Sequence, residues 1–439
     1  MLLIGRPHGA LAGRVAMPGD KSISHRCLMF AGLAAGESRI EGLLEGEDVL
    51  ATASAMRALG CAVERDASGV WSVHGRGVGG LAEPAQVLDM GNAGTGARLL
   101  LGILAGHGFA SFVTGDASLR SRPMRRVIEP LAAMGAAFTA RSGDRLPLAV
   151  RGRDDLLALE HISPVASAQV KSAILLAGLH AAGRTVVTEP LASRDHTERM
   201  LRDMGAELTS QTLSDGRVRV TLEGQPELRA RRFTVAGDPS SAAFVLVAAA
   251  LRADPEVVVE GISVNPLRSG LLTTLLEMGA RIEVRHEREV AGEPVADIHV
   301  RAAPLQGADV PAGRAPSMID EYPVLAVAAA FARGTTRMRG LGELRVKESD
   351  RLQLMAEGLA ACGVTVAIDG DDLIVEGGRR TVAATVDAHL DHRIAMSFLV
   401  LGGLGDAPVR VGGAEAIRTS FPAFVDVMNG LGATIAGDA

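Results

Sequence analysis

One short sequence pattern recurs six times along the chain and restricts the folds that it can adopt. In each copy an apolar, helix-forming stretch leads to a hydrophobic residue, a glycine and then a strand-like run. The six copies are AMRALGCAV, PLAAMGAAF, LRDMGAELT, LLEMGARIE, LAACGVTVA and VMNGLGATI. Their glycines are Gly60, Gly135, Gly205, Gly279, Gly363 and Gly432, separated by 75, 70, 74, 84 and 69 residues. Repetition at such a period indicates a fold built from copies of one supersecondary unit.

The position of the glycine within the pattern predicts where the helix ends. A glycine after a helical run commonly adopts the left-handed conformation that stops the helix, and the alternating residues beyond it suit a strand. Each copy therefore predicts a helix C-terminus followed by a strand. The sequence as a whole predicts a six-fold α/β repeat.

A second pattern precedes each glycine and carries most of the unusual polar residues. In each repeat a polar cluster opens directly into an apolar, alanine-rich run. The clusters are GDKSISHR (19–26), GNAGTGAR (91–98), SAQVKS (167–172), GDPSS (237–241), IDEYP (319–323) and DHRIAM (391–396). Because Ser, Asp and Asn favour helix N-caps, we expect these clusters to cap six buried helices.

Several of these clusters also contain Lys, His or Arg, which caps do not explain. The N-terminus of a helix carries partial positive charge, so a cation there is unfavourable unless an anion lies beside it. If several such helix ends converge, they can bind a small molecule with more than one negative charge. The clusters therefore predict a site for an anionic ligand.

Lysine is rare in this chain, and its positions are informative. Of 45 basic residues only Lys21, Lys171 and Lys347 are lysine, and the other 42 are arginine. Lysine differs from arginine in having a compact ammonium group whose pKa can shift enough to exchange protons. We interpret Lys21 and Lys347 as functional, whereas Lys171 could equally lie on a helix surface.

Composition limits the class of protein. A chain of 439 residues predicts two domains of about 200 residues each, and the 47% hydrophobic content and mean hydropathy of +0.22 are typical of large cores. We expect no transmembrane helix and no secretion signal, and three cysteines without paired spacing favour a reducing cytoplasm. A net charge of −6, with one Trp and one Tyr, argues against nucleic-acid binding.

The polar clusters together resemble a known family. The strings MPGDKSISHR (17–26), LDMGNAGTGARLL (88–100), RPMRRVIEPL (122–131) and SAQVKSAILLAG (167–178) are similar to those of the 5-enolpyruvylshikimate-3-phosphate synthases, members of the enolpyruvyl transferases. The likeness continues through GDPSSAAF (237–244), IDEYPVLAVAAA (319–330), LRVKESDRL (344–352) and DHRIAMSF (391–398). It therefore extends along the whole chain.

The resemblance implies a particular fold and domain division. The family has an α/β (α+β) fold of two pseudo-symmetric domains, each with three βαβαββ-type repeats, which close on their substrates. We expect residues 19–236 to form the N-terminal domain, and 1–18 plus 237–439 the C-terminal domain. The two hinge crossings would lie near 17–20 and 235–240. A single division near 236 is the alternative.

The resemblance also implies the reaction. An enzyme of this family joins the 5-hydroxyl of shikimate-3-phosphate to C2 of phosphoenolpyruvate, protonates C3 and then expels phosphate. This step of aromatic amino acid biosynthesis uses two small-molecule substrates. It requires no metal and no organic cofactor, and family habit suggests a monomer.

The matching positions imply roles for individual residues. Lys21, Asp320 and Glu348 are the expected catalytic residues, with Asp320 as the base for the hydroxyl and Glu348 as the group that moves the C3 proton. The expected shikimate-3-phosphate ligands are Lys21, Ser22, Arg26, Ser167, Ala168, Gln169, Arg194, Asp320 and Lys347. The expected phosphoenolpyruvate ligands are Lys21, Gly94, Arg122, Gln169, Glu348, Arg351, His392 and Arg393. Lys347 and Arg351 are four residues apart, so we expect them to share a helical face.

Two positions distinguish this chain from some members of the family. Many members have serine where this chain has Ala168, and Arg194 could replace the missing hydroxyl contact to phosphate. Gly94 leaves open a space that alanine fills in members tolerant of glyphosate, an inhibitor that competes with phosphoenolpyruvate. We therefore expect this chain to be glyphosate-sensitive.

Three other functions remain open from the sequence. A sister enzyme that transfers enolpyruvyl to a UDP-amino sugar generally uses a cysteine or aspartate on a mobile loop, and Asp116 lies in the corresponding loop 115–126. An RNA-end-processing protein built from related repeats would be expected to have a basic surface. A catalytically inactive anion-binding protein would keep the binding residues, but the expected catalytic residues are all present.

Overall fold

The computed structural model describes residues 1–378 and 380–437, and these form two compact units. The N-terminal unit consists of Gly19–Val235 and Val290–Glu293, and the C-terminal unit of Met1–Pro18, Ala236–Glu289 and Pro294–Ala439. The chain thus changes unit after Pro18 and after Val235. It does so again around Val290–Glu293, a short segment that the sequence analysis assigned to the C-terminal domain.

The N-terminal unit contains three helix–strand repeats in chain order. Its helices are α1 (Lys21–Leu33), α2 (Glu47–Ala58), α3 (Gly94–Ala105), α4 (Ala117–Ser121), α5 (Arg125–Ala133), α6 (Ala168–Gly178) and α7 (His196–Asp203). Its strands are β3 (Ala35–Glu41), β4 (Ala62–Arg65), β5 (Trp71–Arg76), β6 (Leu88–Asp89), β7 (Ala110–Thr114), β8 (Ala137–Arg141), β9 (Arg145–Arg151), β10 (Glu160–Ile162), β11 (Arg184–Glu189), β12 (Leu208–Thr212), β13 (Val218–Glu223) and β14 (Arg232–Thr234).

The C-terminal unit is built in the same way. Its helices are α8 (Pro239–Arg252), α9 (Gly270–Glu277), α10 (Ala315–Met318), α11 (Tyr322–Phe331), α12 (Arg351–Ala361), α13 (His392–Leu404) and α14 (Phe424–Gly430), with 3-10 turns η1 (Pro266–Arg268), η2 (Ala312–Arg314), η3 (Gly342–Val346) and η4 (Ala414–Thr419). Its strands are β1 (Leu3–Arg6), β2 (Leu11–Ala16), β15 (Ala253–Ser263), β16 (Arg281–Val290), β17 (Glu293–Arg301), β18 (Asp309–Val310), β19 (Thr335–Met338), β20 (Thr365–Asp369), β21 (Asp372–Glu376), β22 (Ala384–Asp387), β23 (Val409–Gly412) and β24 (Thr434–Gly437).

The strands of the described residues form six four-stranded sheets with one shared topology. The strand orders are β14-β3-β5-β4, β6-β7-β9-β8, β10-β11-β13-β12, β2-β15-β17-β16, β18-β19-β21-β20 and β22-β23-β1-β24. In every sheet the first pair is parallel and the second is antiparallel. The predicted six-repeat α/β architecture, with three repeats in each unit, is confirmed. The first two strands of the chain complete sheets of the C-terminal unit, because β1 lies between β23 and β24 and β2 pairs with β15.

The six repeated glycines end the second helix of each repeat, as predicted. These helices are α2, α5, α7, α9, α12 and α14. The glycines that follow them have φ values of +89°, +112°, +102°, +90°, +84° and +111°, in chain order. L-residues with a side chain rarely adopt these angles, so the repeated glycine has a backbone cause.

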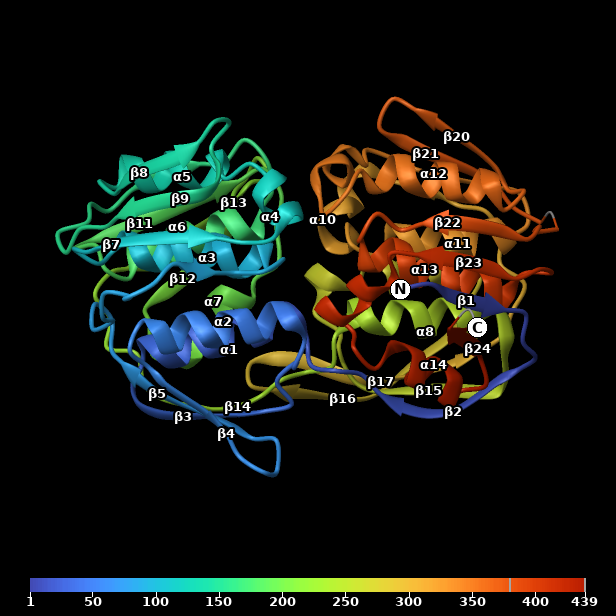
Figure 1. Cartoon of the computed structure of the whole chain (residues 1–439), viewed down its shortest axis with the longest axis horizontal. Helices are drawn as coiled ribbons and strands as arrows, with labels where there is room; N and C mark the ends of the chain where they lie inside the picture. Colours follow the sequence, from blue (N-terminus) through green and yellow to red (C-terminus); the bar gives the residue numbers. More distant parts are fainter. Residues whose placement is uncertain (379, 438–439) are drawn as a thin grey trace. The chain divides into compact units, whose positions relative to one another are not determined.

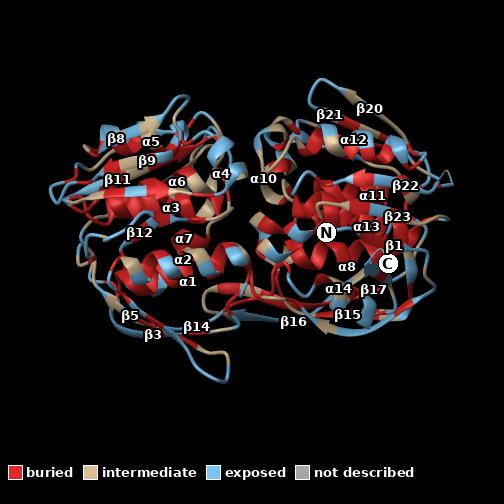
Figure 2. Ribbon diagram, in the orientation of Figure 1, coloured by how far each residue is buried: buried red, intermediate tan, exposed pale blue. Residues whose placement is uncertain are grey.

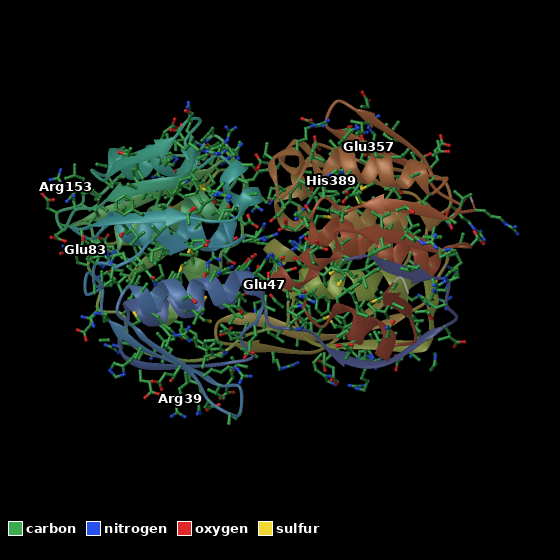
Figure 3. The ribbon with its side chains drawn as sticks, in the orientation of Figure 1. Arg39, Glu47, Glu83, Arg153, Glu357 and His389 are labelled. Atoms are coloured by element: carbon green, nitrogen blue, oxygen red, sulfur yellow. The ribbon has the colours of Figure 1, made fainter. Side chains whose placement is uncertain are left out.

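The first helix of each repeat is buried and begins within one of the six polar clusters, also as predicted. α3 and α6 lie side by side in the N-terminal unit, and α8, α11 and α13 are neighbours in the C-terminal unit (Figure 1). α3, α6, α8, α11 and α13 are buried along most of their length (Figure 2). Charged side chains such as Arg39, Arg153 and Glu357 lie instead on the surface (Figure 3). None of the helices in the described residues has both the length and the apolar character needed to span a membrane.

The expectation that all six polar clusters act as side-chain caps is wrong for two of them. Asp20, Ser167, Asp238 and Asp391 cap α1, α6, α8 and α13. In the part of the chain that the structure describes, α3 and α11 have no side-chain cap. The polar side chains beside those two helix starts are bound elsewhere: Asn92 to an arginine and an aspartate, and Asp320 to a lysine and an arginine.

Candidate active site

In the N-terminal unit, predicted binding residues lie at the first turns of three buried helices. α1 begins at Lys21, α3 at Gly94 and α6 at Ala168. The first N–H groups of a helix have no partner within the helix and carry partial positive charge. These three helix starts therefore supply donors suited to anionic groups.

The ammonium group of Lys21 has a carboxylate neighbour that the sequence analysis did not identify. Its Nζ lies 2.9 Å from Oδ2 of Asp48, at the start of α2. The Lys21 side chain is 18% exposed and that of Asp48 only 6%. The ion pair fixes the ammonium group at the start of α1 and leaves part of it accessible.

Arg26 is a buried cation held by uncharged groups. Its Nε donates to Oγ1 of Thr197 at 2.7 Å, its Nη2 to Oγ of Ser172 at 2.8 Å, and its Nη1 to the main-chain oxygen of Ser22 at 2.9 Å. Burial lowers the pKa of Arg26 to about 10, although nearby carboxylates oppose that shift. Arg26 is thus still charged at neutral pH, and no carboxylate among the described residues forms an ion pair with it.

Gly94, Arg122 and Gln169 are brought together around a further arginine. Arg122 Nη2 donates to Oδ1 of Asn92 at 2.7 Å, and Arg98 Nη1 donates to Oε1 of Gln169 at 3.2 Å. A Cβ atom at Gly94 would lie 2.9 Å from Nη1 of Arg122 and 3.0 Å from Nη1 of Arg98. The glycine therefore allows two guanidinium groups to approach the start of α3.

Lys171 is not on a helix surface, so that alternative is wrong. Its side chain is 2% exposed, and its Nζ lies 2.9 Å from Oε2 of Glu189 and 2.7 Å from Oε1 of Glu198. Burial alone would lower the pKa of Lys171, but the two carboxylates outweigh it and raise the pKa above its usual value. Lys171 is therefore a buried cation with two buried partners.

The remaining predicted residues of this unit lie close in sequence to that buried group. Ser167 caps α6, accepting a hydrogen bond from the N–H of Val170. Ala168 and Gln169 follow in the first turn, and Gln169 Nε2 also donates to Oγ1 of Thr95 at 2.9 Å. Arg194 is half-buried in the segment before α7.

In the C-terminal unit, Arg351 gathers three carboxylates. Its Nε lies 2.8 Å from Oδ2 of Asp391, its Nη1 3.2 Å from Oδ1 of Asp320, and its Nη2 2.6 Å from Oε2 of Glu348. Lys347 Nζ also lies 3.4 Å from Oδ1 of Asp320. Burial alone would lower the pKa of Arg351, but the three carboxylates raise it above its ordinary value. Four predicted residues are thus brought together.

The predicted common helical face of Lys347 and Arg351 is wrong. α12 begins only at Arg351, because the side chain of Asp350 caps it by accepting from the N–H of Gln353. Lys347 directly follows the 3-10 turn η3 instead. The two cations still meet at Asp320, one from a loop and one from a helix.

Arg393 and His392 occupy the first turn of α13. Arg393 Nη1 donates to the main-chain oxygen of Asp320 at 3.1 Å and lies 3.8 Å from Oε1 of Glu321. Glu321 in turn accepts a hydrogen bond from Ser240 at the start of α8. His392 is buried, with 3% exposure. The starts of α8, α11 and α13 are therefore linked by polar contacts.

Among the residues that sequence reasoning missed are four charged side chains that contact the predicted ligands. Arg98 and Asp391 lie within the polar strings, so they could have been found by treating every charged member of a string as a candidate. Glu321 directly follows Asp320 in the string IDEYP, so the same approach would have found it. Asp48 carries no such signal, because its contact with Lys21 depends on how α1 and α2 pack.

Asp116, the residue on which the sister-enzyme alternative rests, has a structural role here. It caps α4 and accepts a hydrogen bond from Nδ2 of Asn92 at 2.7 Å. Cys27, Cys61 and Cys362 are all buried and free. Within residues 1–378 and 380–437, no group of three or more His, Cys, Asp or Glu side chains is arranged to hold a metal ion.

Comparisons with known proteins agree along the full chain. The family model described as EPSP synthase (3-phosphoshikimate 1-carboxyvinyltransferase) matches residues 6–428. A 3-phosphoshikimate 1-carboxyvinyltransferase of Paramagnetospirillum magneticum is 62% identical, covering 99% of this chain and 98% of the relative. One from Rhodospirillum rubrum is 61% identical, covering 97% and 96%.

A solved structure also matches the whole chain. The EPSP synthase of Acinetobacter baumannii superposes with a TM-score of 0.87 at 42% sequence identity, covering 100% of both chains. The family match, the relatives and this structure carry the same family name, as the polar clusters indicated. The chain belongs to the EPSP synthase (3-phosphoshikimate 1-carboxyvinyltransferase) family.

Proposed function

We propose that this enzyme transfers the enolpyruvyl group of phosphoenolpyruvate to the 5-hydroxyl of shikimate-3-phosphate and releases phosphate. The observation that carries the proposal is the cluster around Arg351, in which Asp320 and Glu348 lie beside two cations. Two carboxylates held next to cations suit proton transfer between anionic substrates. Membership of the EPSP synthase family supplies the substrates.

The proposed reaction is an addition followed by an elimination. The 5-hydroxyl oxygen bonds to C2 of phosphoenolpyruvate while Asp320 accepts the hydroxyl proton and Glu348 delivers a proton to C3. The C2–O bond to phosphate then breaks, and C3 returns a proton to Glu348 as the double bond is restored. Lys21 donates to the departing phosphate, whose negative charge a nearby ammonium group stabilises.

Anion binding falls mainly to the helix starts and arginines described above. For shikimate-3-phosphate we propose Lys21, Ser22, Arg26, Ser167, Ala168, Gln169, Arg194, Asp320 and Lys347. For phosphoenolpyruvate we propose Lys21, Gly94, Arg122, Gln169, Glu348, Arg351, His392 and Arg393; Arg351 also holds Glu348 in place. Arginine suits phosphate and carboxylate because its planar fork can donate two parallel hydrogen bonds.

We further propose a cytoplasmic monomer that does not bind nucleic acid. Three buried thiols without disulfides support a reducing compartment. The net charge of −6 supports the absence of nucleic-acid binding.

The test is phosphate release from phosphoenolpyruvate with two different acceptors. Purified protein is mixed with phosphoenolpyruvate in the presence of EDTA and given either shikimate-3-phosphate or a UDP-amino sugar. We expect phosphate release with shikimate-3-phosphate alone, and loss of that activity in Glu348→Gln while shikimate-3-phosphate still binds. Release with the UDP-amino sugar alone, or with neither acceptor, would contradict the proposal.

A further inference from the structure

A buried ionic cluster in the N-terminal unit has no part in the chemistry proposed above. We call Lys171, Glu189, Ser193 and Glu198 the Lys171 cluster; all four side chains are at least nine-tenths buried. Besides its two carboxylate partners, Lys171 Nζ donates to the main-chain oxygen of Ser193 at 3.3 Å. Burying three charged groups carries a large desolvation cost, and apolar side chains usually stabilise a core at least as well. The cluster therefore calls for an explanation other than stability.

Glu189 connects this cluster to the start of α6. Its Oε1 accepts a hydrogen bond from the main-chain N–H of Ser167 at 2.7 Å. Ser167 is the N-cap of α6, and Ala168 and Gln169 follow it in the first turn. One carboxylate oxygen thus fixes the main chain at the point where the proposed phosphate-binding triplet begins.

Glu189 also holds the segment that carries Arg194. The hydroxyl of Ser193, the residue before Arg194, donates to both oxygens of Glu189, at 2.9 and 2.7 Å. The same carboxylate therefore contacts two separate segments with proposed phosphate ligands. Lys171 offsets its negative charge, which would otherwise repel a bound phosphate at short range.

Glu198 provides an internal comparison. It is as buried as Glu189, with 1% against 0% exposure, and it pairs with the same Nζ. Its second oxygen has no hydrogen-bond partner among the described residues. Glu198 therefore shares the charge and burial of Glu189 but not its hydrogen bonds to Ser167 and Ser193, and it acts on the nearby Arg26 through its charge.

We propose that Glu189 is a positioning residue for recognition of the substrate phosphate, with Lys171 as its buried counter-ion. It aligns the N–H groups at the start of α6 with the segment that carries Arg194. This alignment matters in this chain because Ala168 offers no hydroxyl, so the main-chain donors of this turn and Arg194 carry a larger share of phosphate recognition. The inference rests on the proposed function for the identity of the phosphate.

The matched variants Glu189→Gln and Glu198→Gln test this role. Each variant replaces one carboxylate partner of Lys171 with an uncharged amide. Only Glu189→Gln also places an amide NH₂ group where the hydroxyl of Ser193 donates. We expect Glu189→Gln to raise the KM for shikimate-3-phosphate by about tenfold or more, the effect of weakening charge-assisted hydrogen bonds. The KM for phosphoenolpyruvate should change by less than about threefold. In Glu198→Gln the rise in the KM for shikimate-3-phosphate should be at least about threefold smaller than in Glu189→Gln, because Glu198 acts on Arg26 only through its charge.

Equal effects of the two variants, or an equal rise in both KM values, would overturn the inference, because a general loss of stability would act that way. If wild type shows no turnover with shikimate-3-phosphate, the proposed function fails, but the positioning role can still be measured. In ¹⁵N-labelled protein the amide resonances of Ser167 and Arg194 should shift in Glu189→Gln and much less in Glu198→Gln. Shifts of similar size in both variants would contradict the positioning role by itself.

A milder variant covers the case in which Glu189→Gln does not fold. Ser193→Ala removes one donor to Glu189 and leaves both ion pairs of Lys171 intact. We expect it to melt near the wild-type temperature and to raise the KM for shikimate-3-phosphate by about threefold or more. An unchanged KM in a folded Ser193→Ala protein would overturn the inference.

Discussion

Gly94 has a role that depends on the absence of a side chain. The nearest groups to a Cβ atom at this position are the guanidinium ends of Arg122 and Arg98, both at the far end of flexible side chains. A methyl group would therefore displace two cations with little disturbance of the core. The consequence should appear in substrate binding and not in stability.

We accordingly predict that Gly94→Ala raises the KM for phosphoenolpyruvate by up to about tenfold. The unfolding midpoint should not change. Wild type should be inhibited by glyphosate competitively with phosphoenolpyruvate, and the variant should be inhibited less. Gly313→Ala, at a position with nothing within 4 Å, is the control and should leave all three properties unaltered. Unchanged kinetics in Gly94→Ala would contradict this account of the glycine.

His25 makes stability depend on pH. It is fully buried in α1, and burial, aided by the charges of Lys21 and Arg26, lowers its pKa to about 3 from 6.5. Between these values the unfolded chain binds a proton that the folded protein does not. The contribution of His25 is therefore complete above pH 6.5 and is lost as the pH falls towards 3.

We predict that the free energy of unfolding falls with decreasing pH below 6.5, with His25 contributing on the order of 1 kcal/mol per pH unit. Urea unfolding at several pH values measures this slope. His25→Gln should reduce it, whereas His74→Gln, at an exposed position, should not. Some slope should remain in His25→Gln, because burial also lowers the pKa of His180 to about 3. A slope equal to that of wild type in His25→Gln would contradict the assignment.

At the scale of elements, the glycine that ends each second helix was readable from sequence because its cause is local. A left-handed residue after a helix restricts one position to glycine, whatever packs around it. The start of α12 was not readable in this way. Lys347–Glu348 and Arg351 fit one helical face by spacing alone, but Asp350 caps the helix and places the first two in a loop.

The helix-ending role can be tested in two glycines that differ in backbone conformation. Gly205 follows α7 and has a φ of +102°. The atom nearest to a Cβ added at this position would be a main-chain oxygen at 3.8 Å, so space is not limiting there. Gly430, the last residue of α14, has open space and no positive φ. We predict that Gly205→Ala lowers the unfolding free energy by about 1–2 kcal/mol, and that Gly430→Ala raises it by up to about 1 kcal/mol. Equal stability of the two variants in urea would contradict this reasoning.

At the scale of the whole molecule, the six-fold repeat could be predicted because each copy carries its own signals. The order of strands within each sheet could not, since it depends on contacts between residues far apart in sequence. The pairing of β1 with both β23 and β24 is one example. The same limit applies to the candidate site: the polar strings named Lys21, Asp320 and Glu348, but only packing shows that Asp48 lies beside Lys21.

The burial of Lys171 could not be predicted from the sequence either. Lysine is rare among the 45 basic residues, but the sequence favoured a functional role only for Lys21 and Lys347 and equally allowed Lys171 a surface location. Its partners Glu189 and Glu198 come from β11 and α7, which the sequence did not place beside α6. A buried cluster drawn from several elements becomes visible only in three dimensions.

The central claim is that this enzyme transfers enolpyruvyl by addition followed by elimination, with Glu348 moving the C3 proton. The most direct test is the reaction in D₂O with mass spectrometry of the product. C3 of phosphoenolpyruvate becomes a methyl group in the intermediate and then loses a proton. We therefore predict deuterium in the methylene group of the enolpyruvyl product. This labelled product should form only when shikimate-3-phosphate is present. Glu348→Gln should form neither the product nor the label. Product that carries no deuterium at C3 would contradict the account.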